Sequence, residues 1–494
     1  MSGPLIERIN TAVAANPAAP AFIFQDRIVT YAQFLALIHA TTGLLHERGV
    51  RPGDTVGLSM GRWPMHCVAL LALARLGALT IPLPRNLAPD AGRTLAARFG
   101  VSIVVSNWPD APVPPGARLV LLDSMSVAGA AGEPDLGGYL PDDATPLRVA
   151  LTSGTTGARR GVIHTHASFM QRVDLTAFDC DQHTRLLPPD LHVTAGILMT
   201  MAVLTRGGTV VFDRTFSVTD IANAIRLYGV THFLLSPAAV LPIAAILPER
   251  GLAFPSLRHL RIVGATPPPA MVELLHNRFT PQVYGVYGIT EVGMLAFATP
   301  DTLGAAPGCA GRIVPWARIE VLGPDGQSLP PGESGELRVA TDGMPREYHC
   351  EPPGPAPSRF RDGWFHTGDF GRMTADGLVF VEGRADDIVN LGGHKYALPL
   401  IDAGLESHPA VRTAVAFTLE DADGNVVVGA AVERKPGQGV PGLDEIAARV
   451  RRDMGISVAV RLFEAPGLTR DDMGKINRDA VRTRVLGPRE QAPR

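Results

Sequence analysis

The sequence predicts an α/β fold with a large N-terminal domain and a small α+β C-terminal domain. The large domain is expected to contain two α/β sheet subdomains and a small β-barrel-like region. Three observations support this prediction. Helix-like and strand-like segments alternate in two separate stretches, short strands with Gly/Pro turns begin near residue 311, and the pattern becomes mixed again after residue 384.

The first alternating stretch lies near the N-terminus. Residues 30–48 carry apolar side chains at helical spacing, and Thr30 is a candidate N-cap. Residues 54–60 then predict a short buried strand, 65–76 a second helix and 78–83 a second strand. Such alternation is typical of a mostly parallel sheet covered by helices.

The same alternation returns in the second stretch. It predicts a helix at 220–228, a strand at 231–235, a helix at 237–247 and a strand at 259–263. After residue 311 the turn sequences GPDG and PPGESG would close β-hairpins, which indicates an antiparallel region.

The C-terminal residues combine both patterns. Strand-like segments at 388–393, 411–419 and 426–434 alternate with helix-like segments at 399–407 and 443–455. We therefore expect a compact α+β domain at this end of the chain.

The composition excludes several classes of protein. The 45 Lys and Arg residues are balanced by 48 Asp and Glu residues, which leaves no basic excess for binding nucleic acid. We expect no signal peptide and no membrane span, because the longest apolar run, residues 67–83, is split by Arg75 and closed by Pro82. The four cysteines lie far apart, which favours a reducing cytoplasm over a disulfide framework or a zinc site.

The most informative segment is LTSGTTGARRGV at residues 151–162. It contains six consecutive small or hydroxylated residues, which are Thr152, Ser153, Gly154, Thr155, Thr156 and Gly157. Their backbone N–H groups and hydroxyls can wrap a polyphosphate. The segment lacks the Lys-Ser/Thr pair of a P-loop, and its composition alone favours a flexible surface loop.

Five further segments change that interpretation, because they follow in a recognisable order. They are YGITE at 287–291, TGD at 367–369, GRADD at 383–387, GGHK at 392–395 and GKI at 474–476. Together with residues 151–162 they resemble the motifs of the AMP-forming adenylate synthetases. This family includes acyl-CoA and aryl-CoA synthetases, adenylation domains of nonribosomal peptide synthetases, and luciferases.

The resemblance implies that the carboxylate of an acid attacks the α-phosphorus of ATP and produces acyl-AMP and pyrophosphate. Residues 152–157 would hold the β- and γ-phosphates, and Thr290 would contact the α-phosphate. Glu291 would be the ligand of Mg²⁺, which usually binds one carboxylate together with phosphate oxygens. Two anions must meet, so Lys475 would touch both the attacking carboxylate and the α-phosphate in the transition state.

The nucleoside would be held by other motif residues. Tyr287 would stack on adenine, Asp369 would accept hydrogen bonds from both ribose hydroxyls, and Arg384 would reinforce that end of the nucleotide. Small residues would pack on the opposite face of the adenine ring, namely Gly264, Ala265 and Thr266.

The resemblance also implies a mobile C-terminal domain, because Lys475 and the phosphate loop lie in different domains. Residues 1–383 would form the large domain, 384–386 a hinge with Asp386 as its pivot, and 387–494 a lid. A second lid orientation would serve thioester formation. Gly392, Gly393, His394 and Lys395 would then line a tunnel for a pantetheine thiol. A simple Gly-Gly turn is the alternative.

The acid pocket has the weakest signal. The segment LPPDLHVTAG makes His192 a candidate for the pocket wall, with Ser236, Gly264 and Gly285 nearby. A core histidine with an ordinary hydrogen bond is the alternative for His192. No Phe-Asp pair stands where amino-acid-activating domains bind an α-amino group, although Asp190 could serve that purpose, so an amine-free acid is favoured.

Three features depart from the family or need a structural interpretation. Arg159-Arg160 stands where many relatives have Pro-Lys, so pyrophosphate contacts could differ. Residues 398–402, LPLID, replace the usual Pro-x-Glu-Ile-Glu, which puts partner docking in doubt. His164 and His166 have metal-like spacing, but no further ligands complete a site, so they are expected to be structural.

These observations predict an AMP-forming acid–thiol ligase that uses ATP and Mg²⁺. The favoured acid is aryl or medium-chain acyl, and the favoured acceptor is coenzyme A. The alternative is a stand-alone adenylation enzyme that loads an acid, including an amino acid, onto the phosphopantetheine of a carrier protein. A nucleotide-binding protein without catalysis is disfavoured, because Lys475, Glu291 and Asp369 are all present.

Overall fold

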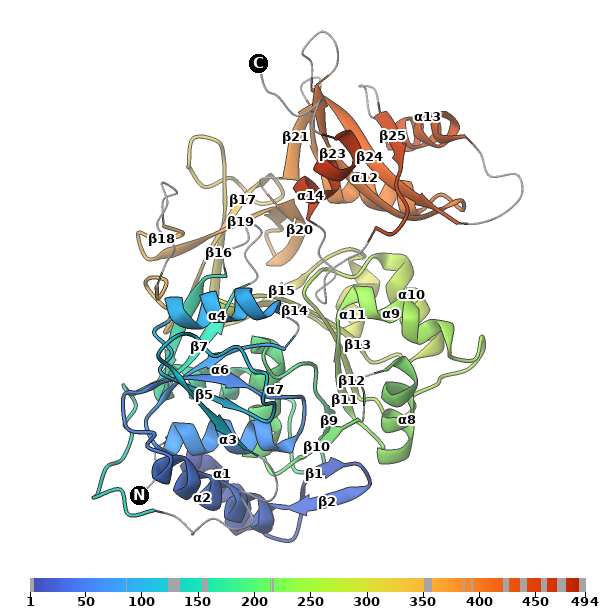
Figure 1. Ribbon diagram of the computed structural model, residues 1–494. Helices are drawn as coiled ribbons and strands as arrows, with labels where there is room; N and C mark the ends of the chain where they lie inside the picture. Colours follow the sequence, from blue (N-terminus) through green and yellow to red (C-terminus); the bar gives the residue numbers. More distant parts are fainter. Residues whose placement is uncertain are drawn as a thin grey trace.

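The computed structural model of the chain describes residues 4–85, 87–122, 134–152, 159–213, 215, 217–350, 358–384, 387–391, 394–420, 426–435, 442–454, 460–468 and 477–487. Ser153–Gly157, Asp386, Gly392, Gly393 and Lys475 lie outside these residues. The described strands form a 14-stranded, a six-stranded, a three-stranded and a two-stranded sheet (Figure 1).

The six-stranded sheet confirms the first predicted α/β unit. Its order is β6-β5-β3-β4-β7-β8, and only the β7–β8 pair is antiparallel. The strands are β3 (Thr55–Ser59), β4 (Leu79–Pro82), β5 (Ile103–Ser106), β6 (Arg118–Leu121), β7 (Pro146–Leu151) and β8 (Gly161–Thr165). The helix α2 (Tyr31–Glu47) begins with a capping box in which Thr30 and Gln33 each satisfy the other's backbone N–H. Thr30 is therefore the N-cap, as the sequence predicts.

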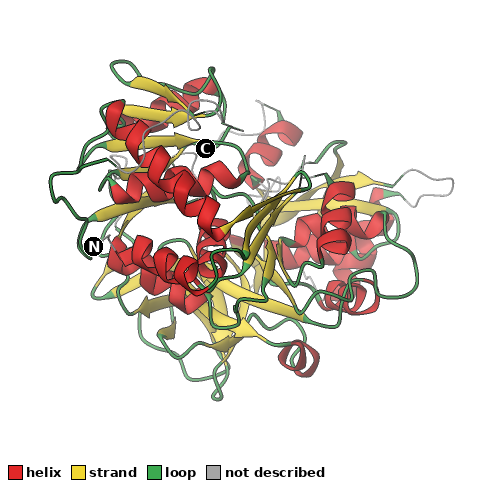
Figure 2. Ribbon diagram, turned by 90° about the horizontal axis from the view of Figure 1, so that it is seen from below, coloured by secondary structure: helices red, strands yellow, loops and turns green. Residues whose placement is uncertain are grey.

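The large sheet contains the second predicted α/β unit. Its parallel strands are β1 (Pro20–Phe24), β9 (Arg185–Leu187), β10 (Thr209–Phe212), β11 (His232–Leu235), β12 (His259–Val263) and β13 (Val283–Ile289), and β2 (Arg27–Thr30) pairs antiparallel at one edge. Parallel strands buried on both faces require helices on both sides, and Figure 2 shows helices flanking the strands in this way.

Helices fill the space between the two sheets and cover their outer faces. The central core combines α1 (Pro4–Ala15), α2, α3 (Pro64–Arg75), α6 (His166–Thr176) and α7 (Thr194–Thr205) with residues of both sheets. A second core lies under α8 (Val218–Tyr228), α9 (Pro237–Ala245) and α10 (Pro269–Arg278) on the other face of the large sheet. The six-stranded sheet packs its outer face against α4 (Pro89–Arg98).

The antiparallel region continues the large sheet beyond β13. Its strands are β14 (Gly293–Ala298), β15 (Gly311–Ile313), β16 (Ala317–Leu322), β17 (Ser334–Thr341), β18 (Phe360–Arg361), β19 (Trp364–Met373) and β20 (Leu378–Arg384), and α11 (Pro300–Ala305) links β14 to β15. Both predicted turn sequences lie between β16 and the start of β17, which pair antiparallel as one hairpin rather than two. The described strands do not close into a barrel. The reason is that β14 pairs with β13, so the backbone hydrogen bonds run on into the parallel strands.

The C-terminal domain is α+β, as the sequence predicts, and it lies at one end of the molecule beyond β20 (Figure 1). Its sheet is β23 (Val411–Glu420), β24 (Val426–Arg434) and β25 (Val460–Glu464), with a separate hairpin of β21 (Ile388–Leu391) and β22 (His394–Ala397). One core lies under α12 (Leu398–Glu406) and α13 (Leu443–Met454), and another includes residues of α14 (Arg478–Leu486). None of the described helices is both long and apolar enough to cross a membrane.

Candidate active site

The predicted site residues gather where adjacent parallel strands end. Ser236 follows β11, Gly264 follows β12, and Tyr287 lies in the second half of β13. In an open parallel sheet, the carboxyl ends of the strands lie at one edge, and ligands bind in the crevice outside it. The fold therefore brings three separate sequence segments to one place.

The two strands that flank the predicted phosphate loop belong to the six-stranded sheet. The loop connects β7 to β8, and the Thr152 N–H donates to the Arg160 carbonyl across its base at 2.8 Å. Ala150 and Val162, on either side of the loop, pack in one cluster with Val292 and Leu295 of the YGITE region. Thr152 is buried. The residues on either side of the loop therefore share a cluster with residues that follow Glu291 in the chain.

Glu291 lies in the tight turn between β13 and β14 and is only 6% exposed. Its Oε1 accepts a hydrogen bond from the Tyr348 hydroxyl at 2.7 Å. Its Oε2 has no hydrogen bond to the part of the chain that the structure describes. A carboxylate with one anchored and one available oxygen suits a hard cation such as Mg²⁺, so the donor set fits the ion that the sequence implies.

Arg172 of α6 fixes the backbone of the same turn. Its guanidinium donates to the carbonyl of Thr290 at 2.8 Å and to the carbonyl of Glu291 at 2.5 Å. Burial lowers the pKa of Arg172 to about 10, although the charge of Glu291 opposes the shift. Arg172 thus remains a cation at neutral pH. Its hydrogen bonds direct the backbone carbonyls of Thr290 and Glu291 toward α6.

Asp369 joins Tyr287 and Arg384 into one hydrogen-bonded group. Oδ2 accepts from the Tyr287 hydroxyl at 2.7 Å, and Oδ1 accepts from Arg384 Nη1 at 2.7 Å. Burial, followed by the charge of Asp369, raises the pKa of Tyr287 well above its ordinary value, so the phenol stays a donor. Each carboxylate oxygen can accept further hydrogen bonds, which leaves capacity for the ribose hydroxyls predicted here.

The TGD turn supports this carboxylate from behind. The Thr367 hydroxyl accepts from the Asp369 N–H at 2.8 Å and donates to the Leu337 carbonyl at 2.7 Å. Gly368 has φ +67°, and an added Cβ would lie 2.9 Å from an Arg384 nitrogen, so the turn requires glycine. The Thr367 carbonyl in turn accepts from Arg384 and Arg359.

The segment predicted to face adenine is open at the end of β12. Gly264 has φ +90°, and Gly264 and Ala265 are exposed while Thr266 is half-buried. Small exposed residues beside β13 fit the predicted approach of a flat ring to the backbone. Stacking of Tyr287 on adenine stays a prediction.

His192 lies on the segment before α7 and touches a second histidine. Its Nδ1 lies 2.8 Å from Asp190 Oδ1, and its ring meets His66 of α3 edge to face with centroids 4.8 Å apart. Its Nε2 is buried and has no hydrogen-bond partner among the described residues. Burial would raise the pKa of Asp190, but the hydrogen bonds from His192 outweigh it and hold that pKa low. Asp190 is thus paired with His192, and a place for His192 in the pocket wall stays a prediction.

The remaining pocket candidates lie on neighbouring strands. Ser236 is half-buried at the N-terminus of α9, where its hydroxyl makes no capping hydrogen bond. Gly285 is buried in β13, and an added Cβ would approach Ala298 at 3.3 Å and Leu303 of α11 at 3.7 Å. Their contact with an acid stays a prediction.

The predicted residues of the C-terminal domain are only partly described. Lys395 lies on β22 opposite Asn390 of β21. Asp402, in the segment that departs from the family pattern, is buried and pairs with Arg478 through contacts of 2.6 and 3.2 Å. It therefore anchors α14 inside the domain. Asp387 also contacts Arg478 at 3.3 Å.

The expected structural role of His164 and His166 agrees with their surroundings. Both are buried, and burial lowers the pKa of His164 well below its ordinary value and that of His166 to about 4. Neither belongs to a cluster of metal-ligating side chains among the described residues.

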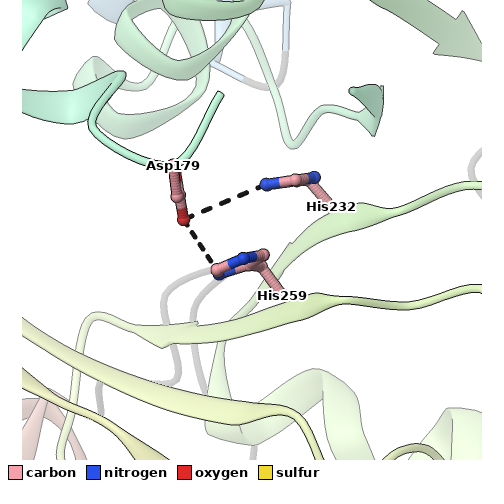
Figure 3. Close-up of side chains that lie close together, drawn as sticks. All are labelled: Asp179, His232 and His259. Atoms are coloured by element: carbon pink, nitrogen blue, oxygen red, sulfur yellow. Dashed lines mark ion pairs between the residues drawn. The ribbon is translucent and has the colours of Figure 1, made fainter. Parts of the chain in front are cut away.

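One cluster of such side chains lies elsewhere, at the opposite ends of the strands (Figure 3). Asp179 Oδ2 is 2.9 Å from His259 Nδ1 and 3.9 Å from His232 Nε2. The two imidazole rings are stacked 4.6 Å apart with planes only 14° from parallel, so their in-plane lone pairs do not converge on one point. Arg261 also pairs with Asp179 and supplies the positive charge that a metal ion would bring. The cluster is therefore an ion-pair group between strands and not a metal centre.

Sequence reasoning missed Tyr348, Arg172 and the Asp179 cluster. Tyr348 and Arg172 lie outside the six motifs, and their partners are distant in the chain. His232 and His259 begin successive parallel strands, a spacing that could have placed them side by side.

Comparisons with known proteins agree with this geometry. The family model described as AMP-binding enzyme matches residues 9–349. The chain is 28% identical to an indoleacetate–CoA ligase of Aromatoleum aromaticum over 97% of this chain and 98% of the relative. It is 29% identical to the fatty acid–[acyl-carrier-protein] ligase ScoC of Streptomyces coeruleorubidus, over 96% of this chain and 94% of the relative.

A solved structure has the same fold along almost the whole chain. It is the O-succinylbenzoate coenzyme A synthetase MenE of Bacillus subtilis in complex with ATP and magnesium ion. The TM-score is 0.85, the sequence identity is 23%, and the match covers 96% of this chain and 99% of MenE.

Proposed function

Because the chain belongs to the family of AMP-binding enzymes, we propose that it is an ATP-dependent acid–thiol ligase that forms an acyl adenylate and then a thioester. The observation that carries this proposal is that Glu291, Asp369 and the residues at the base of the phosphate loop lie together. They lie beside the carboxyl ends of the parallel strands. Those three groups come from separate parts of the chain.

In the first step, the acid carboxylate attacks the α-phosphorus and pyrophosphate leaves. Residues 152–157 would hold the β- and γ-phosphates, and Thr290 would contact the α-phosphate. Asp369 and Arg384 would bind the ribose end. Bound at Glu291, Mg²⁺ would neutralise phosphate charge. Lys475 would bring a cation to the two approaching anions when the C-terminal domain closes about Asp386.

In the second step, a thiol takes the acyl group and AMP leaves. We favour coenzyme A as the acceptor, supported by the similarity to an indoleacetate–CoA ligase. The pantetheine thiol would enter beside Gly392, Gly393 and Lys395. Loading of a carrier protein is the second candidate, and the similarity to ScoC favours it.

We propose an aryl or medium-chain acyl acid as the substrate. His192 would form part of the pocket wall, with Ser236, Gly264 and Gly285 nearby. The pairing of Asp190 with His192 supports an acid without an amino group, because that carboxylate already has a partner. A cytoplasmic location is also proposed, supported by the four free cysteines.

Exchange of labelled pyrophosphate into ATP tests the first step. The chain has only three lysines, Lys395, Lys435 and Lys475, so Lys435→Ala is a matched control. We expect Lys475→Ala to slow exchange about a hundred- to a thousandfold, the usual cost of one preorganised transition-state contact, and Lys435→Ala to leave it unchanged. No exchange by the wild-type protein with aryl, aliphatic, hydroxy or amino acids would overturn the proposal.

A thioester assay then separates the two acceptors. The wild-type protein is incubated with ATP and the best acid, together with either coenzyme A or a panel of holo carrier proteins. We expect acyl-CoA to form faster. Product on a carrier protein alone would favour the second candidate, and a preference for an amino acid would point to Asp190.

A further inference from the structure

Glu291 is held by a side chain that belongs to none of the motifs. The Tyr348 hydroxyl donates a hydrogen bond to Glu291 Oε1 at 2.7 Å. Tyr348 and Glu291 are each only 6% exposed. Within the described residues this is the hydrogen bond that orients the carboxylate. Oε2 is the oxygen that has no hydrogen bond to the described residues and is available to a ligand.

Three contacts fix Tyr348 in turn. The neighbouring His349 N–H donates to the Gly161 carbonyl at 2.7 Å, which ties this segment to the first residue of β8. Phe360 meets the tyrosine ring edge to face at 5.1 Å. The Arg160 guanidinium lies 5.1 Å above the ring centre. Tyr348 is therefore attached to the end of the phosphate loop and to Glu291 at the same time.

The charge state of the phenol suits this arrangement. Burial, followed by the charge of Glu291, raises the pKa of Tyr348 above its ordinary value. The hydroxyl remains protonated at neutral pH and can only donate to the carboxylate. The planar guanidinium of Arg160 can stack on a ring as an ammonium cannot.

We propose that Tyr348 is a positioning residue that orients Glu291 toward the Mg²⁺ of the nucleotide, with Arg160 holding the tyrosine ring. This inference rests on the proposed function, because it takes Glu291 as the ligand of that ion. Hydrogen-bond partners of metal-binding carboxylates fix the ligand rotamer before the ion arrives. Their loss typically weakens metal affinity about 10- to 100-fold.

The test measures metal binding without turnover. Mn²⁺, which replaces Mg²⁺ and is visible by electron paramagnetic resonance, is titrated into the protein with saturating ATP and no acid. We expect Tyr348→Phe to weaken Mn²⁺ binding by about tenfold or more. Tyr284→Phe is the matched control. It removes a tyrosine hydroxyl that contacts Gln282 at 3.3 Å, and it should leave the affinity unchanged.

A double-mutant comparison shows whether Tyr348 acts through Glu291. In a Glu291→Gln background, Tyr348→Phe should weaken Mn²⁺ binding no further. Unchanged affinity in the single variant, or an equal loss in both backgrounds, would overturn the inference. Should Tyr348→Phe fail to fold, Tyr348→Leu replaces it, because leucine has neither a hydroxyl nor a metal-binding atom. Failure of the proposed function is distinct, since wild-type protein would then show no pyrophosphate exchange.

Discussion

Asp369 shows how one residue can be committed to a site before any ligand binds. Both of its oxygens already accept hydrogen bonds, from Tyr287 and Arg384, and its backbone is fixed by Thr367. A carboxylate held in this way would lose little further freedom on accepting the ribose hydroxyls that we propose it binds. The same residue in a mobile turn would bind them more weakly.

We expect Asp369→Asn to raise the KM for ATP about tenfold or more, because hydrogen bonds to charged groups contribute about 1.5–3 kcal/mol each. The measurement is pyrophosphate exchange with ATP and with 2′,3′-dideoxy-ATP. The variant and the wild-type protein should differ little with the dideoxy nucleotide, which lacks both hydroxyls. An equal penalty with both nucleotides would show that Asp369 does not contact the ribose.

At the scale of elements, a buried ion pair joins two helices of the C-terminal domain. Asp402 of α12 pairs with Arg478, the first residue of α14, and also accepts from the Ala416 N–H of β23 at 2.5 Å. Arg478 donates to the Ala416 carbonyl as well. The contacts hold the start of α14 against the sheet, next to the segment that contains Lys475.

Arg478→Leu should lower the free energy of unfolding of this domain by about 3–5 kcal/mol, because it leaves the Asp402 carboxylate buried without its cation. Urea denaturation followed by circular dichroism measures the change. The double variant Asp402→Leu/Arg478→Leu should recover most of the loss, since apolar side chains can replace a buried pair. A loss in the double variant as large as in the single one would contradict this explanation.

At the scale of the whole molecule, buried histidines make stability depend on pH. Burial is the main cause that lowers the pKa values of His66, His164 and His166. These residues therefore stay neutral in the folded protein. The unfolded chain binds protons at these residues below about pH 6.5. It therefore gains protons that the folded protein does not, and stability falls as the pH drops below that value.

Each such histidine should contribute a slope of about 1.4 kcal/mol per pH unit between the two pKa values. We expect thermal unfolding to show a falling midpoint from pH 7 to pH 5, with a shallower fall in His164→Gln. An identical pH profile for the variant would show that His164 takes up a proton in the folded state. His183→Gln, which alters an exposed histidine, is the control.

Individual residues show which contacts can be predicted from the sequence and which cannot. Thr30 predicted the start of α2, and the YGITE and TGD motifs predicted residues that lie together in the structure. Tyr348 and Arg172 escaped prediction, because a tyrosine or an arginine outside a motif has no local signal for the partner it meets. The role of Asp402 also escaped prediction, and its contact with Arg478 explains it.

The sequence by itself determined the alternation of helices and strands and the family, and it predicted the residues of the nucleotide site. Those properties depend on periodicity and on motifs that are continuous in the chain. The tertiary structure alone decided that the antiparallel strands extend the large sheet, that Glu291 meets Tyr348, and that two stacked histidines share Asp179 with an arginine. The physical reason is that the Glu291–Tyr348 and Asp179 contacts join residues distant in the chain, and packing of the whole molecule selects them. The extension of the sheet likewise depends on which strands pair, and no local pattern encodes that choice.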